Sequence, residues 1–142
     1  MLVVQDSWGY CFGAFIPTSL TTAHGSRYYG GGETWLYSFH NQAPEQVGVY
    51  RWTRANELFI LSSERQLAIG GGGGFGLQLD DDLDNGVSNP CATFENLRLS
   101  STEFFKTLNV ELFMLKAVEN QREAGGGSAI DAQQAFEFDN DC

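Results

Sequence analysis

The chain has 142 residues, of which 42% are apolar, and a formal net charge of −10 at pH 7. A chain of this length forms one domain with a single sizeable core. Only 8 lysines and arginines stand against 18 aspartates and glutamates. This balance excludes sequence-independent nucleic-acid binding, because neutralising phosphates requires clustered cations.

The N-terminus and the cysteines indicate a cytoplasmic protein. The chain reaches Asp6 before the apolar core of a signal peptide could form, and no purely apolar run exceeds four residues. No insertion into a membrane is therefore expected. Cys11, Cys91 and Cys142 have neither metal-ligand nor disulfide-framework spacing, which predicts reduced thiols.

Most of the chain reads as short strands. Aromatic and β-branched segments are separated by clusters of Gly, Asn, Asp, Pro or Ser, which is typical of strands joined by turns. In chain order, the predicted strands are residues 8–16, 33–39, 47–52, 57–61, 66–70, 75–79 and 108–115. No helical segment is available for the crossovers of a parallel sheet. The sequence therefore predicts a mainly β fold, namely a two-sheet antiparallel β-sandwich.

The composition changes near Val118. Residues 118–142 contain six acidic residues and one arginine, hence a net charge of −5, and a Gly-Gly-Gly-Ser hinge. Too few apolar positions recur in this stretch to bury a helix. We expect a sandwich domain over residues 1–117 and a disordered acidic tail over residues 118–142, the alternative for the tail being a short helix that folds on a partner.

Five consecutive glycines, Gly70–Gly74, raise the question of a phosphate-binding loop. Gly71, Gly73 and Gly76 satisfy the GxGxxG spacing, but a run of five glycines satisfies almost any such pattern. A dinucleotide site requires a helix after the glycines, whereas the segment that follows alternates as a strand. The run is therefore predicted to serve backbone geometry, allowing neighbouring chain segments to approach closely.

Three carboxylates follow the glycine run. Asp80, Asp82 and Asp84 have the spacing of a calcium loop, but Asn85 occupies its glycine position and Cys91 its glutamate position. We expect a solvated turn ending in Asn85-Gly86, a dipeptide that favours tight hairpins.

The polar residues offer little for catalysis. His24 and His40 lie in loop-like sequence and lack metal-binding spacing, and no local nucleophile motif surrounds Cys91. Glu33 follows three glycines and is expected to be a strand-edge carboxylate. Two alternatives stay open: a thiol- or carboxylate-dependent enzyme acting on oxidised substrates, and a lectin-like sandwich that stacks ligands on Tyr28, Tyr29 and Trp35.

Several motifs in a fixed order resemble the TLDc domain of the oxidation-resistance protein family. They are GYCFGAF, YYGGGETWLYSF, YRWTRANELFI, LAIGGGGGFGLQLDDDL, NGVSNPCATFENLRLS and VELF. The resemblance spans Val4 to Phe113. The candidate interaction or family-motif positions are Gly13, Gly31, Gly32, Glu33, Gly71, Gly72, Gly73, Asp80 and Asp82.

The resemblance implies a β-sandwich with short flanking helices and no established reaction or cofactor, so no catalytic, cofactor-binding or metal-binding residue is expected. It implies instead a non-enzymatic interaction module that binds subunits of the vacuolar proton-pumping ATPase and contributes to oxidative-stress resistance. Such a protein would be cytoplasmic and recruited to organelle membranes through the pump.

The sequence departs from the family pattern in two ways. It begins almost at the FGAF strand, without the family's N-terminal helical stretch, which would leave Val3, Phe12 and Phe15 uncovered. Gln78 stands where many members have Trp, and Arg54 stands where many have Gly.

Overall fold

The computed structural model describes residues 1–39 and 47–114; His40 and the predicted tail, residues 118–142, lie outside them. The described chain forms nine strands that pair antiparallel throughout. They are β1 (Leu2–Asp6), β2 (Cys11–Phe15), β3 (Trp35–Phe39), β4 (Val47–Tyr50), β5 (Ile60–Ser62), β6 (Gln66–Ile69), β7 (Leu77–Asp80), β8 (Asn85–Val87) and β9 (Phe104–Leu112).

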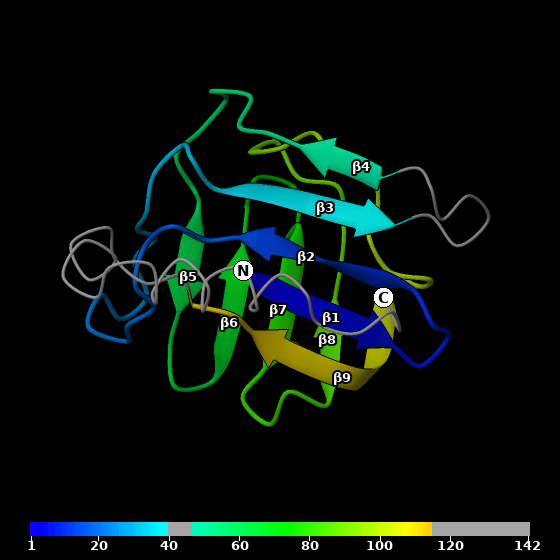
Figure 1. Ribbon diagram of the computed structural model, residues 1–142. Coiled ribbons are helices and arrows are strands. Elements are labelled where there is room, and N and C mark those ends of the chain that lie inside the picture. Colours follow the sequence, from blue (N-terminus) through cyan, green and yellow to red (C-terminus); the bar gives the residue numbers. More distant parts are fainter. Residues whose placement is uncertain (40–46, 115–142) are drawn as a thin grey trace, which may run out of the picture.

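The strands form one continuous sheet in the order β4-β3-β2-β1-β9-β8-β7-β6-β5. The long strand β9 joins its two halves, because residues near Phe104 pair with β8 while residues from Thr107 to Leu112 pair with β1. Figure 1 shows the sheet folded over at β9, so that β1–β4 lie in front of β5–β8 and cross them.

The core lies between these two halves. Phe12 and Leu36 from the front half and Ile69 and Leu77 from the other half are fully or almost fully buried. A Cβ atom on Gly76 would come within 2.6 Å of Leu36 Cδ1, which shows how closely the halves approach. Burying one such aliphatic or aromatic side chain stabilises the fold by ~1.5–3 kcal/mol.

The mainly β class is confirmed. The sandwich takes the form of one folded sheet rather than two separate sheets, because β9 is long enough to hydrogen-bond to both halves. Residues 1–39 and 47–114 contain no helix, so the expected flanking helices are not found there. Within the same ranges, no helix is long and apolar enough to cross a membrane.

Two strands were not predicted from the sequence, β1 and β8. β8 begins at Asn85, so the Asn85-Gly86 dipeptide lies in a strand and does not close the turn as expected. The chain reverses just before it, where Leu83 adopts a φ of 62° and donates its amide to the Asp80 carbonyl at 3.0 Å. Gly86 is needed in the strand because a side chain there would press against the ring of Phe105.

Candidate functional site

The glycine run packs against a second loop, residues 91–93. The Gly72 carbonyl accepts a hydrogen bond from the Ala92 amide at 2.9 Å, and the Gly71 carbonyl accepts one from the Thr93 amide at 3.3 Å. In return, the Gly71 amide donates to Thr93 Oγ1 at 2.9 Å. The two loops therefore pair almost as strands do, which requires close backbone approach.

A third loop, residues 52–58, completes this cluster. Thr93 Oγ1 lies 2.7 Å from Asn56 Oδ1, and Asn56 Nδ2 donates to the Gly71 carbonyl at 3.3 Å. Thr53 Oγ1 donates to the Ala92 carbonyl at 2.7 Å. Buried polar groups need such partners, and here the glycine run and the two loops supply them to one another. The Gly71 amide and carbonyl thus serve contacts within the fold, which disfavours the phosphate-cradle interpretation.

Substitutions at two neighbouring glycines separate crowding from backbone strain. Gly72 and Gly73 have φ angles of 86° and 89°, so alanine is strained at either. A Cβ atom on Gly72 would also come within 2.9 Å of Ala92 Cβ and of Asn56 Nδ2, whereas one on Gly73 would meet nothing within 4 Å. We expect Gly72→Ala to destabilise the domain by ~2 kcal/mol and Gly73→Ala by ~1 kcal/mol. Equal losses in chemical denaturation would show that crowding at Gly72 is unimportant.

Gly31, Gly32 and Glu33 lie in the loop before β3. Gly32 lies under the indole of Trp52, which leaves no room for a side chain. The Gly31 carbonyl accepts the Thr34 amide at 3.1 Å. Glu33 is exposed, so its side chain is available only for contacts at the surface of the domain.

Asp80 and Asp82 have different environments. Asp80 is half-buried at the end of β7 and accepts a hydrogen bond from Gln78 Nε2 at 3.2 Å. Asp82 is exposed, and its Oδ1 accepts the Asp84 amide at 3.0 Å within the turn. Among the residues that the structure describes, no three His, Cys, Asp or Glu side chains are grouped as metal ligands.

Cys91 is a buried free thiol between the glycine run and residue 96. Its Sγ lies 3.2 Å from Asn96 Oδ1. Burial raises the pKa of the Cys91 thiol, which disfavours the reactive thiolate at neutral pH. His24 is exposed and stacks on Tyr29 at 4.4 Å. Cys11 is disulfide-bonded, so the expectation of a reduced thiol is wrong there.

The three aromatics considered as a ligand platform are each half-buried and engaged within the fold. The Tyr28 hydroxyl donates to the Gly70 carbonyl at 3.3 Å, and the Tyr29 hydroxyl accepts the Thr21 amide at 3.0 Å. Trp35 stacks on Phe15 at 5.6 Å. These contacts disfavour the stacking platform that the sequence left open.

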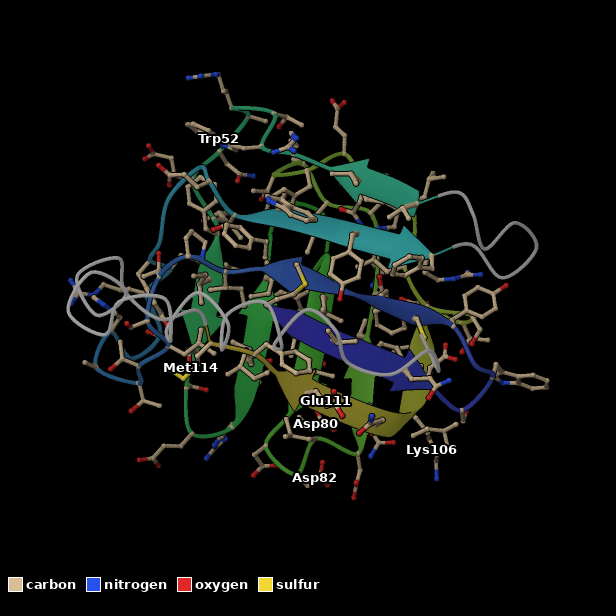
Figure 2. The ribbon with its side chains drawn as sticks, in the orientation of Figure 1. Trp52, Asp80, Asp82, Lys106, Glu111 and Met114 are labelled. Atoms are coloured by element: carbon tan, nitrogen blue, oxygen red, sulfur yellow. The ribbon has the colours of Figure 1, made fainter. Side chains whose placement is uncertain are left out.

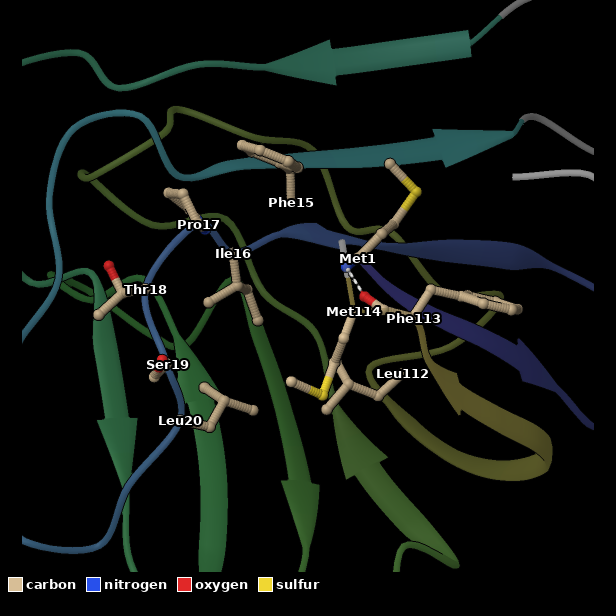
Figure 3. A pocket seen from close by; sticks show the side chains of 10 residues that line it. All are labelled: Met1, Phe15, Ile16, Pro17, Thr18, Ser19, Leu20, Leu112, Phe113 and Met114. Atoms are coloured by element: carbon tan, nitrogen blue, oxygen red, sulfur yellow. Dashed lines mark hydrogen bonds between the residues drawn. The ribbon is translucent and has the colours of Figure 1, made fainter. Parts of the chain in front are cut away.

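An apolar hollow of about 450 Å³ lies where the segment after β2 meets the end of β9, as Figure 3 shows. It is lined by Met1, Phe15, Ile16, Pro17, Thr18, Ser19, Leu20, Leu112, Phe113 and Met114. The Met1 ammonium group donates to the Phe113 carbonyl at 2.6 Å across its rim. Phe15 is half-buried here, but Val3 and Phe12 are buried, so the expectation that they would be uncovered is wrong.

A second hollow of about 570 Å³ lies on the outer face of β7, β8 and β9, and we call it the Trp8–Phe104 groove. It is lined by Ser7, Trp8, Gln78, Asp80, Asn85, Gly86, Val87, Thr102, Phe104, Phe105 and Lys106. Neither Trp8 nor Phe104 is among the candidate positions predicted from the sequence. Trp8 was placed in a strand, although Asp6-Ser7-Trp8-Gly9 has the composition of a turn, and that signal could have revealed its exposure.

Comparison with known proteins identifies the family of the chain. The TLDc domain family matches residues 1–116. The chain belongs to the TLDc domain family. Over 114 residues it is 41% identical to "Oxidation resistance protein 1" of Homo sapiens, which covers 80% of this chain and 12% of that protein. Over 114 residues it is 40% identical to "Nuclear receptor coactivator 7" of Gallus gallus, with the same coverage.

A third relative, "Oxidation resistance protein 1" of Bos taurus, is 40% identical over 117 residues, which cover 82% of this chain and 13% of that protein. The resemblance deduced from the motifs is therefore confirmed. The TLDc chain spans about an eighth of the length of these relatives.

Proposed function

We propose that this TLDc chain is a non-enzymatic interaction module that contributes to oxidative-stress resistance by binding the vacuolar proton-pumping ATPase. The observation that carries the proposal is the match to the TLDc family over residues 1–116, together with relatives named for oxidation resistance. The module acts in the cytoplasm and reaches organelle membranes through the pump.

The interior of the fold supports binding rather than catalysis. The glycine run and the hydroxyl of Thr93 are committed to contacts between loops. Cys91, the nucleophile of the thiol alternative, is buried with a raised pKa. The thiol and the loop groups considered for chemistry are thus occupied in holding the fold, and the surface remains available for recognition.

Alkylation of Cys91 tests the thiol alternative. We expect Cys91 in the folded protein to react with iodoacetamide far more slowly than in guanidinium, because burial excludes the reagent and raises the thiol pKa. Because the pKa of Cys91 is higher in the folded chain than in the unfolded chain, the protonated thiol contributes fully to stability below the unfolded pKa of ~8.5. This contribution is lost as the pH rises through the folded pKa. Mass spectrometry of the Cys91 peptide measures the rate. Fast labelling of folded protein at neutral pH would support the thiol alternative.

Affinity purification tests the proposal itself. The tagged chain is expressed in eukaryotic cells, and the recovered proteins are compared with those recovered by the destabilised Gly72→Ala variant and by an unrelated acidic protein. We expect pump subunits to be enriched with the wild-type chain, in proportion to the amount of folded protein. Absence of pump subunits beside a folded, abundant chain would refute the proposed partner.

A further inference from the structure

We propose that the Trp8–Phe104 groove is a docking surface for a basic segment of a partner protein that carries an apolar or aromatic anchor residue. The inference rests on the proposed function, because it names the surface with which the module would hold a partner.

Two of the three aromatic rings that line the groove are unusually accessible. Trp8 is 72% exposed and Phe104 is 71% exposed, although large apolar side chains normally contribute to a core. Aromatic residues of this kind, above all Trp, dominate the binding energy at protein interfaces. Both line the same hollow, so a partner segment seated in it meets both rings.

One buried carboxylate supports both rings. Asp6 is fully buried, and its Oδ1 accepts the amides of Trp8 at 3.0 Å and of Tyr10 at 2.9 Å. Its Oδ2 accepts the amide of Ser101 at 2.9 Å and the hydroxyl of Ser101 at 2.7 Å. Asp6 thereby ties the turn that carries Trp8 to the segment that leads into Phe104. Such support lowers the entropy lost on binding, because the groove is already formed.

The floor of the groove is made of paired strands. Val87 of β8 pairs with Gln78 on one side and with Phe104 on the other. Gln78 is 8% exposed, and its Nε2 donates to Gln66 Oε1 and to Asp80 Oδ1, each at 3.2 Å. A partner would therefore meet a fixed polar floor between two exposed rings.

The charge around the groove is mainly negative. Asp80 lines it, Glu103 lies between the lining residues Thr102 and Phe104, and the adjoining turn adds Asp81, Asp82 and Asp84. That turn is fastened to β9, because Thr107 donates its amide to the Asp84 carbonyl at 3.0 Å and its hydroxyl to the Leu83 carbonyl at 2.6 Å.

Three cations oppose these five carboxylates: Lys106 lines the groove, Arg98 donates to the carbonyls of Ser100 and Ser101, and Arg65 precedes Gln66, the partner of Asp80 in β6. Figure 2 shows Asp80, Asp82 and Lys106 toward the lower edge of the molecule. The excess of negative charge favours a cationic partner and accelerates its association. A second copy of the chain is disfavoured, because each copy carries a net charge of −10.

Three labelled synthetic peptides test the proposal with the whole chain. The first alternates lysine and leucine around a central phenylalanine, the second has glutamate for lysine, and the third has serine for the apolar residues. We expect fluorescence anisotropy to give a Kd for the first peptide at least about tenfold below that of either other peptide. Raising the salt concentration from ~0.05 M to ~0.5 M should weaken this binding, since salt screens the charges.

Variants of the chain locate the binding. Trp8→Ala and Phe104→Ala should each raise the Kd of the first peptide about tenfold or more, as expected for anchor contacts. Asp82→Asn with Glu103→Gln should reduce its dependence on salt. The matched control is Met114→Ala, which removes an 82% exposed side chain away from the groove and should leave the Kd unchanged. Thermal melting verifies that each variant is folded.

Several outcomes overturn the inference. These are equal affinity for the acidic peptide, no binding of the basic apolar peptide, and unchanged binding by folded Trp8→Ala and Phe104→Ala. Self-association or oligosaccharide binding that is lost in Trp8→Ala would assign the groove to another occupant. If the pump binds wild-type chain and both aromatic variants equally, the groove fails while the proposed function stands. If the groove binds the basic peptide but the pump is never recovered, the proposed function fails.

Discussion

Replacing Gly13 by alanine is expected to lower the free energy of unfolding by ~3 kcal/mol or more, beyond the usual penalty for overpacking. Gly13 lies in the middle of β2, and a Cβ atom there would overlap the Leu2 carbonyl oxygen and come within 2.7 Å of the Tyr37 hydroxyl. That hydroxyl crosses over Gly13 to donate to the Leu2 carbonyl at 2.9 Å. A side chain at Gly13 would therefore displace both the strand and a buried hydrogen bond.

Chemical denaturation of Gly13→Ala beside Gly31→Ala measures this effect. Gly31 is a suitable control because an added Cβ atom would meet only the end of the exposed Glu33 side chain, at 3.0 Å. We expect Gly31→Ala to remain within ~0.5 kcal/mol of the wild-type chain. A Gly13→Ala domain as stable as Gly31→Ala would contradict the close packing of β2 against Leu2 and Tyr37.

Replacing Asp6 by alanine is expected to destabilise the domain by ~4 kcal/mol. The buried carboxylate accepts four hydrogen bonds, from the amides of Trp8, Tyr10 and Ser101 and from the Ser101 hydroxyl. Hydrogen bonds to a charged group contribute about 1.5–3 kcal/mol each. Because all four bonds are only partly buried, water replaces some of the lost partners, which keeps the loss below the sum. The unfolding free energy from denaturant titration gives the size of the loss.

The Asp6→Asn variant separates the contributions of the two carboxylate oxygens to this loss of stability. Its Oδ1 can still accept the amides of Trp8 and Tyr10, whereas its Nδ2 would face the donors of Ser101. We therefore expect Asp6→Asn to fall between the wild-type chain and Asp6→Ala, and to loosen the segment at Ser101 before the turn at Trp8. Hydrogen exchange measures this difference: in Asp6→Asn, the Ser101 amide should exchange faster than the Trp8 amide. An Asp6→Asn variant as stable as the wild-type chain would show that the link to Ser101 contributes little.

The strands that the sequence predicted well are those with strong local patterns. Around Leu36 and Leu77, aromatic or alternating apolar residues are bounded by glycines, and the structure places β3 and β7 there. The segment Asn85–Val87 has no such pattern, and its dipeptide Asn-Gly favours turns in isolation. It becomes β8 because it is held between β7 and β9, a tertiary effect that local propensity does not contain.

The sequence predicts that the glycine run serves backbone geometry, but it does not predict which loop the run packs against. The alternation after Gly76 excluded a helix and therefore a dinucleotide site. That Gly71 and Gly72 pair with Ala92 and Thr93 depends on a contact between loops about 20 residues apart, for which no local pattern exists.

The Trp8–Phe104 groove shows the limit of sequence reasoning most clearly. Its two exposed aromatic residues are far apart in the sequence and line the same hollow because β1 pairs with β9 and because Asp6 reaches Ser101. A lone exposed Trp in a turn and a Phe at the start of a strand have no distinctive spacing. Only the fold brings them to one face.

A solution titration tests most directly the proposal that the folded chain is a binding module for the vacuolar proton-pumping ATPase. Purified chain is titrated with the purified ATPase, and complex formation is followed by fluorescence anisotropy of the labelled chain. The account predicts saturable binding with a Kd of ~1 µM or tighter, as a specific interface of ordinary size can provide. A folded, monomeric chain that shows no binding at ~100-fold higher concentration would contradict it.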